Sequence, residues 1–136
     1  MRPCISVKFF WLCALFITLD GCAMSYIKKR LPAPYRADGG ILFQYDAPSA
    51  RHVNLAGNFP DNEWLRDGDK VDMMNDSGVN GDRVPGDGVW SILKELPSGR
   101  YEYKFVVDRN SWVKDPNAID TIDDGYGGEN SVLIVK

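Results

Sequence analysis

The chain has 136 residues and a net charge of −3 at neutral pH, and its composition is 44% hydrophobic and 26% charged. Such a length accommodates one domain with a short additional segment and leaves little room for a second core. The acidic balance lacks the basic footprint of nucleic-acid-binding proteins, so we expect no nucleic-acid partner.

Residues 1–21 have the pattern of a secretory signal peptide. Two basic residues precede the apolar run 9–19, and Gly21 stands directly before Cys22. The apolar run is shorter than the roughly 20 residues that a membrane-spanning helix needs. We therefore expect the protein to be exported and residues 1–21 to be removed.

Cys22 is the candidate for lipidation. The residues LDGC (19–22) resemble the bacterial lipobox, although Asp20 departs from the small or apolar residue usual at its position. Removal of the signal also removes Cys4 and Cys13, and the single remaining cysteine excludes a disulfide scaffold. Acyl chains such as palmitate on Cys22 would anchor the protein in the bacterial cell envelope, at the outer membrane or the periplasmic face in a diderm cell. The alternative is an unmodified cysteine at the end of a cleaved signal.

Residues 22–40 are expected to form a tether. A basic triplet and two prolines are followed by Asp-Gly-Gly, and no periodicity is sustained. This mixed basic and Pro/Gly composition is typical of linkers. The folded domain is accordingly expected over residues 41–136.

From residue 41 onward the pattern is that of short strands separated by turn residues, with no convincing amphipathic helix. The predicted strands are 41–46, 52–57, 89–96, 101–108 and 131–136. This pattern predicts an all-β fold, an immunoglobulin-like antiparallel β-sandwich. Trp90 is assigned to its core. In the strand 101–108 the aromatic residues alternate with Glu102 and Lys104, so we expect Lys104 to be exposed and available to a ligand.

Four segments carry most of the functional information. They are 57–64 (GNFPDNEW), 101–108 (YEYKFVVD), 111–116 (SWVKDP) and 127–136 (GGENSVLIVK). They contribute two tryptophans, a lysine and an asparagine to what we expect to be one shallow surface. An indole buries the apolar face of a sugar ring with little loss of entropy. A lysine donates hydrogen bonds to hydroxyls, and an asparagine both donates and accepts them. This combination favours sugar binding over catalysis.

The same segments resemble the glycogen-binding domain of AMP-activated protein kinase β subunits. That domain belongs to the family-48 carbohydrate-binding modules, which share an early-set, immunoglobulin-like fold with the N-terminal domains of isoamylases. The resemblance covers residues 41–136 and is most specific in YEYKFVVDRNSWVKDP. It implies a non-catalytic module that binds an α-glucan such as glycogen, starch or a maltooligosaccharide.

The resemblance also implies five carbohydrate-binding residues. Trp64 and Trp112 correspond to the sugar-stacking tryptophans, and Lys104 and Asn130 correspond to the hydrogen-bonding pair. Tyr126 stands about where the family often has a leucine that props the sugar chain. The alternatives are structural: a tryptophan packed against a hairpin, a lysine that only faces water, or an asparagine that caps a strand.

Three places depart from the family pattern. The loop 60–63 is longer than usual, and Arg109 and Asn110 replace the glycine that follows the strand-ending aspartate. Gly128 stands where the family has a threonine, which removes one polar contact.

The loop 75–88 is rich in glycine and aspartate. Asp76, Asp82 and Asp87 could supply carboxylate oxygens to calcium. Their spacing differs from that of an EF-hand, and such turns also connect strands without a metal. We expect no cofactor, and calcium is the weaker alternative for this loop.

We expect no enzymatic activity. A glycosidase needs two carboxylates roughly 5–9 Å apart across a cleft, whereas the carboxylates here fall in turns and on solvent faces. His52 is the single histidine, and no nucleophile motif or zinc ligand set accompanies it. The second hypothesis is an immunoglobulin-like domain that has lost sugar binding and contacts an envelope protein partner. Sugar binding would depend on both Trp64 and Trp112, whereas a protein interface need not.

Overall fold

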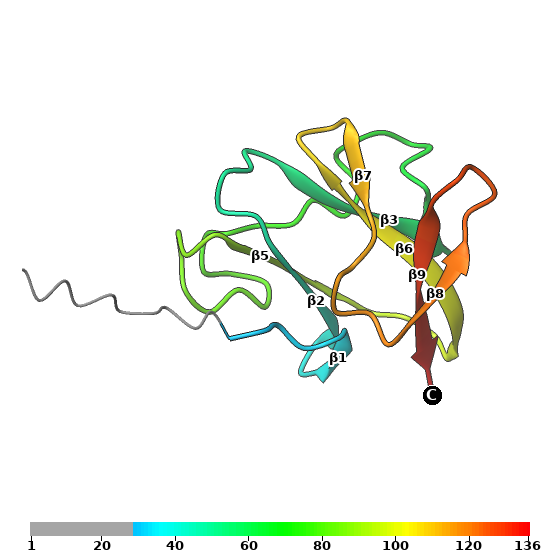
Figure 1. Cartoon of the computed structure of the whole chain (residues 1–136). Coiled ribbons are helices and arrows are strands. Elements are labelled where there is room, and N and C mark those ends of the chain that lie inside the picture. The colour runs from blue at the N-terminus through cyan, green and yellow to red at the C-terminus, as the bar shows by residue number, and fades with distance from the viewer. Residues whose placement is uncertain (1–28) are drawn as a thin grey trace, which may run out of the picture.

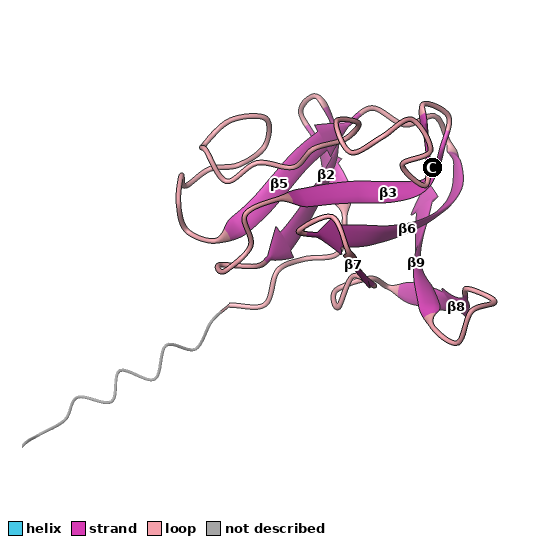
Figure 2. Ribbon diagram, turned by 90° about the horizontal axis from the view of Figure 1, so that it is seen from above, coloured by secondary structure: helices cyan, strands magenta, loops and turns pink. Residues whose placement is uncertain are grey.

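The computed structural model describes residues 29–136. The predicted signal peptide, the predicted lipidation site Cys22 and the first part of the predicted tether lie outside the described residues. Figure 2 shows strands and loops throughout this part of the chain, without a helix. Accordingly, residues 29–136 hold no helix with the length and apolarity to cross a membrane.

The strands form two antiparallel sheets (Figure 1). The strands are β1 (Tyr35–Ala37), β2 (Gly40–Asp46), β3 (Val53–Phe59), β4 (Asn62–Glu63), β5 (Val89–Lys94), β6 (Gly99–Val107), β7 (Ser111–Val113), β8 (Asp120–Asp123) and β9 (Glu129–Val135). The smaller sheet has the order β1-β2-β5, and the larger has the order β4-β3-β6-β9-β8 with β7 paired to β6. The predicted all-β antiparallel sandwich is confirmed.

The five strands predicted from alternation correspond to β2, β3, β5, β6 and β9. The sequence did not predict the four short strands. One of them, β1, lies within the stretch assigned to the tether and pairs with β2 from Tyr35↔Leu42 to Ala37↔Gly40. Strand pairing in the described residues thus begins at Tyr35, before residue 41.

The core lies between the two sheets and is rich in aromatic side chains. Phe43 of β2 is fully buried and meets Tyr103 of β6 edge-on, with ring centroids 5.2 Å apart. Tyr45 stacks on Phe105 at 4.8 Å. Edge-to-face and offset-stacked pairs are the favourable geometries for aromatic rings. Trp90 packs partly buried against this core, and its indole N–H donates to the Ala47 carbonyl at 3.1 Å.

A buried hydrogen-bond network joins β6 to the segments beside it. The Tyr103 hydroxyl donates to Asp115 Oδ2 at 2.6 Å, and the Asp115 N–H donates to Ser131 Oγ at 2.7 Å. Asp115 is only 2% exposed, and burial raises the pKa of its carboxyl. Because β7 and β9 both pair with β6, this network holds their facing ends together. It therefore fixes the position of the site that these strands carry.

Candidate functional site

The outer face of the larger sheet carries three of the predicted site residues. Trp112 of β7 lies opposite Val106 of β6, which shares its face with Lys104. Val132 of β9 lies opposite Glu102, so Asn130, two residues earlier, is on that face too. The register of β6 with its two neighbours therefore gathers Lys104, Trp112 and Asn130.

Trp64 reaches the same face from the loop after β4. Its backbone N–H donates to the Gly57 carbonyl at 2.8 Å. Buried Asn62 anchors the loop, since its amide donates to the Leu55 carbonyl at 2.8 Å and its oxygen accepts the Leu65 N–H at 2.9 Å. Trp64 and Leu65 have positive φ angles of 54° and 58°, which non-glycine residues rarely adopt. The longer loop is thus held by specific hydrogen bonds.

Lys94, a buried lysine on β5 of the smaller sheet, forms ion pairs that hold this loop in place. The Lys94 ammonium lies 2.6 Å from Asp61 and 2.9 Å from Asp72, and its side chain is 5% exposed. It also lies 5.2 Å from the centroid of the Phe59 ring. The carboxylate of Asp72 accepts a further bond from Asn62 at 2.7 Å. Lys94 thereby supports the anchor of the Trp64 loop.

The loop between β8 and β9 folds over Lys104. Asp124 Oδ1 accepts the N–H groups of Tyr126 at 2.7 Å and Gly128 at 3.0 Å, and Oδ2 accepts the Lys104 ammonium at 2.6 Å. The Lys104 side chain is only 14% exposed, so the prediction that it is exposed is wrong, and its availability to a ligand stays a prediction. Alternation along a strand tells which side a residue faces, and it does not tell which loop covers that side. Tyr126, at the tip of the loop, is 96% exposed.

All five predicted site residues line one hollow of about 550 Å³. Within residues 29–136, the side-chain amide of Asn130 makes no hydrogen bond, so its donor and acceptor groups are available to a ligand. One N–H of the Lys104 ammonium donates to Asp124, and the other two remain available to a ligand. The hollow therefore presents two indoles beside free hydrogen-bonding groups.

Two residues of this hollow, Glu102 and Asp124, were not predicted. Glu102 lies two residues before Lys104 on β6, so both side chains are on the same face of the strand. This alternation could have identified Glu102 as a site residue. Asp124 stands before a glycine-rich turn, where an aspartate commonly accepts N–H groups of the residues that follow it. Nothing in the sequence pointed to its pairing with a lysine twenty positions earlier.

The pairing has a measurable consequence for Asp124. The Lys104 hydrogen bond, helped by the N–H groups of Tyr126 and Gly128, lowers the pKa of Asp124 from 3.8 to about 2. Because this pKa is lower in the folded state, the pairing stabilises the fold fully above about pH 4 and is lost as the pH falls through about 2. We expect carbon-13 NMR titration to find a pKa near 2. In Lys104→Met it should rise toward the ordinary value, and an ordinary value in the wild type would contradict the ion pair.

Comparison with protein families finds one match. The family described as the glycogen recognition site of AMP-activated protein kinase matches residues 41–136. The chain belongs to this family. The match spans β2 to β9 and includes every strand and loop that lines the hollow. The domain is thus a carbohydrate-binding module by family, as the resemblance implied. No curated protein matches the chain.

The aspartates of the loop 75–88 come together in this domain. Asp76, Asp82 and Asp87 each offer a carboxylate oxygen, and these oxygens lie within 4.8 Å of one another. Backbone N–H groups of Gly88 and Gly78 donate to Asp76 and Asp82 at 2.9 and 2.7 Å. These bonds hold the turns of the loop. Calcium at the three carboxylates stays a prediction.

Proposed function

We propose that this domain binds an α-glucan, of the glycogen, starch or maltooligosaccharide class, on the outer face of its larger sheet. The observation that carries the proposal is the convergence of Trp64, Lys104, Trp112, Tyr126 and Asn130 on one hollow. Residues far apart in the sequence arrive there from β6, β7, β9 and two loops. Family membership supports glycogen-like polysaccharide as the ligand class.

The chemistry of the hollow suits a chain of hexoses. Trp112 is 45% exposed and offers an indole face on which a sugar ring can stack. The rim hydroxyls need donors and acceptors, and an unpartnered hydroxyl removed from water costs about 1–3 kcal/mol. Lys104 donates, Glu102 accepts, and Asn130 does both. Stacking supplies most of the affinity in this proposal, and the polar groups select orientation and linkage.

The proposal includes a non-catalytic role in the bacterial cell envelope. The signal-peptide pattern of residues 1–21 and the lipobox-like LDGC support export and lipidation at Cys22. A lipid there would hold the domain at a membrane surface through the segment that precedes β1. The domain would then retain glucan, or bring it to a separate envelope protein.

The test is a tryptophan-fluorescence titration of the full-length chain with maltoheptaose, with cellohexaose as the control for linkage. We expect saturable quenching by the α-linked sugar alone, because Trp64 and Trp112 line the hollow. In Trp64→Ala the response should fall sharply. Trp90, partly buried on the smaller sheet, supplies a background signal that the sugar does not reach.

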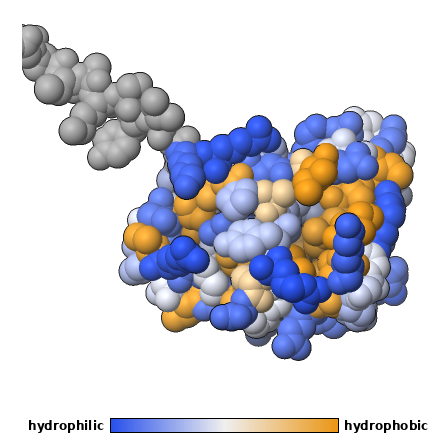
Figure 3. Space-filling view, turned by 90° about the horizontal axis from the view of Figure 1, so that it is seen from below, coloured by the Kyte–Doolittle hydropathy of each residue, from blue (hydrophilic) through white to orange (hydrophobic). Residues whose placement is uncertain are grey.

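The absence of any response in a folded wild-type domain would contradict glucan binding. Protein contact would then be the better interpretation, because apolar side chains are also exposed. On the face drawn in Figure 3, apolar patches lie among hydrophilic side chains. Ile119 is 89% exposed and Ile134 is 57% exposed.

A further inference from the structure

A second hollow of about 560 Å³ adjoins the first. Its volume falls in the range of roughly 300–1,000 Å³ that ligand sites occupy. Trp112 and Lys104 line both hollows, so the two meet at these side chains. Trp112 therefore lies at the boundary between the two hollows.

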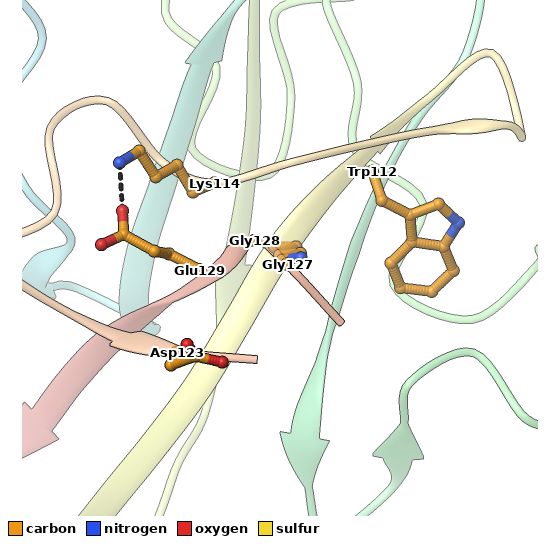
Figure 4. A pocket seen from close by; sticks show the side chains of 7 residues that line it. Trp112, Lys114, Asp123, Gly127, Gly128 and Glu129 are labelled. Carbon is orange, nitrogen blue, oxygen red and sulfur yellow. Dashed lines mark hydrogen bonds and ion pairs between the residues drawn. The ribbon is translucent and has the colours of Figure 1, made fainter. Parts of the chain in front are cut away.

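Figure 4 shows how the second hollow is bounded. Trp112 lies on one side and the ion pair of Lys114 with Glu129 on the other, with Gly127 and Gly128 between them. Lys114 directly follows β7, and its side chain and that of Trp112 both line this hollow. The two glycines bring no side chain into the space, and a Cβ added at Gly127 would meet no heavy atom within 4 Å.

Lys114 and Glu129, on the side of the hollow opposite Trp112, offer hydrogen-bonding groups that suit the hydroxyls of a hexose. Lys114 and Glu129 are about half exposed, so an incoming hydroxyl can reach both. The ammonium donates and the carboxylate accepts, which matches two neighbouring hydroxyls on a sugar ring. The Lys114 ammonium also lowers the pKa of Glu129, so the carboxylate is ionised at neutral pH.

We propose that the second hollow is an additional subsite for the same glucan, in which Lys114 and Glu129 bind sugar residues that lie beyond Trp112. The inference rests on the proposed function. A short oligosaccharide fills the first hollow, and a longer one continues across Trp112 into the second. Lys114 and Glu129 then set the preference for chain length, and they contribute nothing to a chain too short to reach them.

The test is isothermal titration calorimetry of the full-length chain with maltotriose and maltoheptaose. The variants are Lys114→Met, which keeps the aliphatic stem, and Glu129→Gln, which keeps the shape. Arg83→Met removes a charge from the loop 75–88 and is the matched control. We expect each subsite variant to weaken maltoheptaose binding about fivefold, the effect of losing one hydrogen bond of ordinary strength at a half-exposed position, and to leave maltotriose binding unchanged.

A longer oligosaccharide also has a higher apparent affinity because it can bind in more registers. The decisive result is therefore a loss of affinity in the variants that affects maltoheptaose and not maltotriose. Equal weakening of both sugars, or no change for maltoheptaose, would overturn the second subsite. In either case binding of maltotriose by the wild type would leave the proposed function intact. A wild type that binds neither sugar would overturn both.

Discussion

Replacing Trp112 by alanine is expected to weaken maltoheptaose binding roughly 30-fold, which corresponds to about 2 kcal/mol and is typical of a buried aromatic anchor at an interface. The expected loss of affinity is large because Trp112 lines both hollows. Its removal takes away sugar stacking on both sides of their boundary. The indole is 45% exposed without ligand, and no aromatic ring packs on it within residues 29–136. Calorimetric titration measures the effect.

The same substitution should leave thermal stability nearly unchanged, since substitutions of exposed side chains usually shift stability by less than about 0.5 kcal/mol. Tyr35→Ala is the matched control, because Tyr35 is an aromatic residue on the smaller sheet with a similar exposure of 40%. It should bind maltoheptaose as the wild type does. If Trp112→Ala binds normally, or if Tyr35→Ala loses as much affinity, the outer face of the larger sheet is not the binding surface.

The second large effect is expected on stability, from Lys94→Met. Methionine keeps much of the volume but leaves Asp72, which is 13% exposed, without its cation. Breaking a buried ion pair by removing one partner costs about 3–5 kcal/mol. We expect a loss near 3 kcal/mol in urea unfolding. Weaker sugar binding should accompany it, because Asp72 and Asn62 hold the Trp64 loop.

A double variant separates the ion pair from simple packing. Removing both charges together is often close to neutral, so Lys94→Met with Asp72→Asn should recover much of the lost stability. Lys70→Met, at an exposed position, is the control and should unfold like the wild type. A double variant as unstable as the sum of its single changes would show that Lys94 does not act through Asp72.

The sequence predicted the parts of the fold that repeat a pattern. The strands β2, β3, β5, β6 and β9 each have six or more residues, which is long enough for alternation to be visible. The strands β1, β4, β7 and β8 have two to four residues and are defined by pairing with distant segments. Such pairing depends on where the longer strands have already placed the chain.

The site was predictable where it resembled a known motif and not where it depended on loop packing. Trp64, Lys104, Trp112, Tyr126 and Asn130 were identified from short segments, and the structure gathers them. Their roles in binding stay predictions. The cover that Asp124 provides over Lys104 follows from the path of the loop between β8 and β9. The ion pairs of Lys94 with Asp61 and Asp72 likewise join positions that share no pattern in the sequence, so the sequence could not predict them.

The most direct test of the central claim is a two-dimensional NMR titration of the isotopically labelled chain with maltoheptaose. We predict saturable shifts of the Trp64 and Trp112 indole N–H signals and of the Asn130 side-chain amide, with the Trp90 indole unchanged. Shifts confined to other surfaces, such as the smaller sheet around Tyr35, or no shifts at all in a folded domain, would contradict a glucan site on the outer face of the larger sheet.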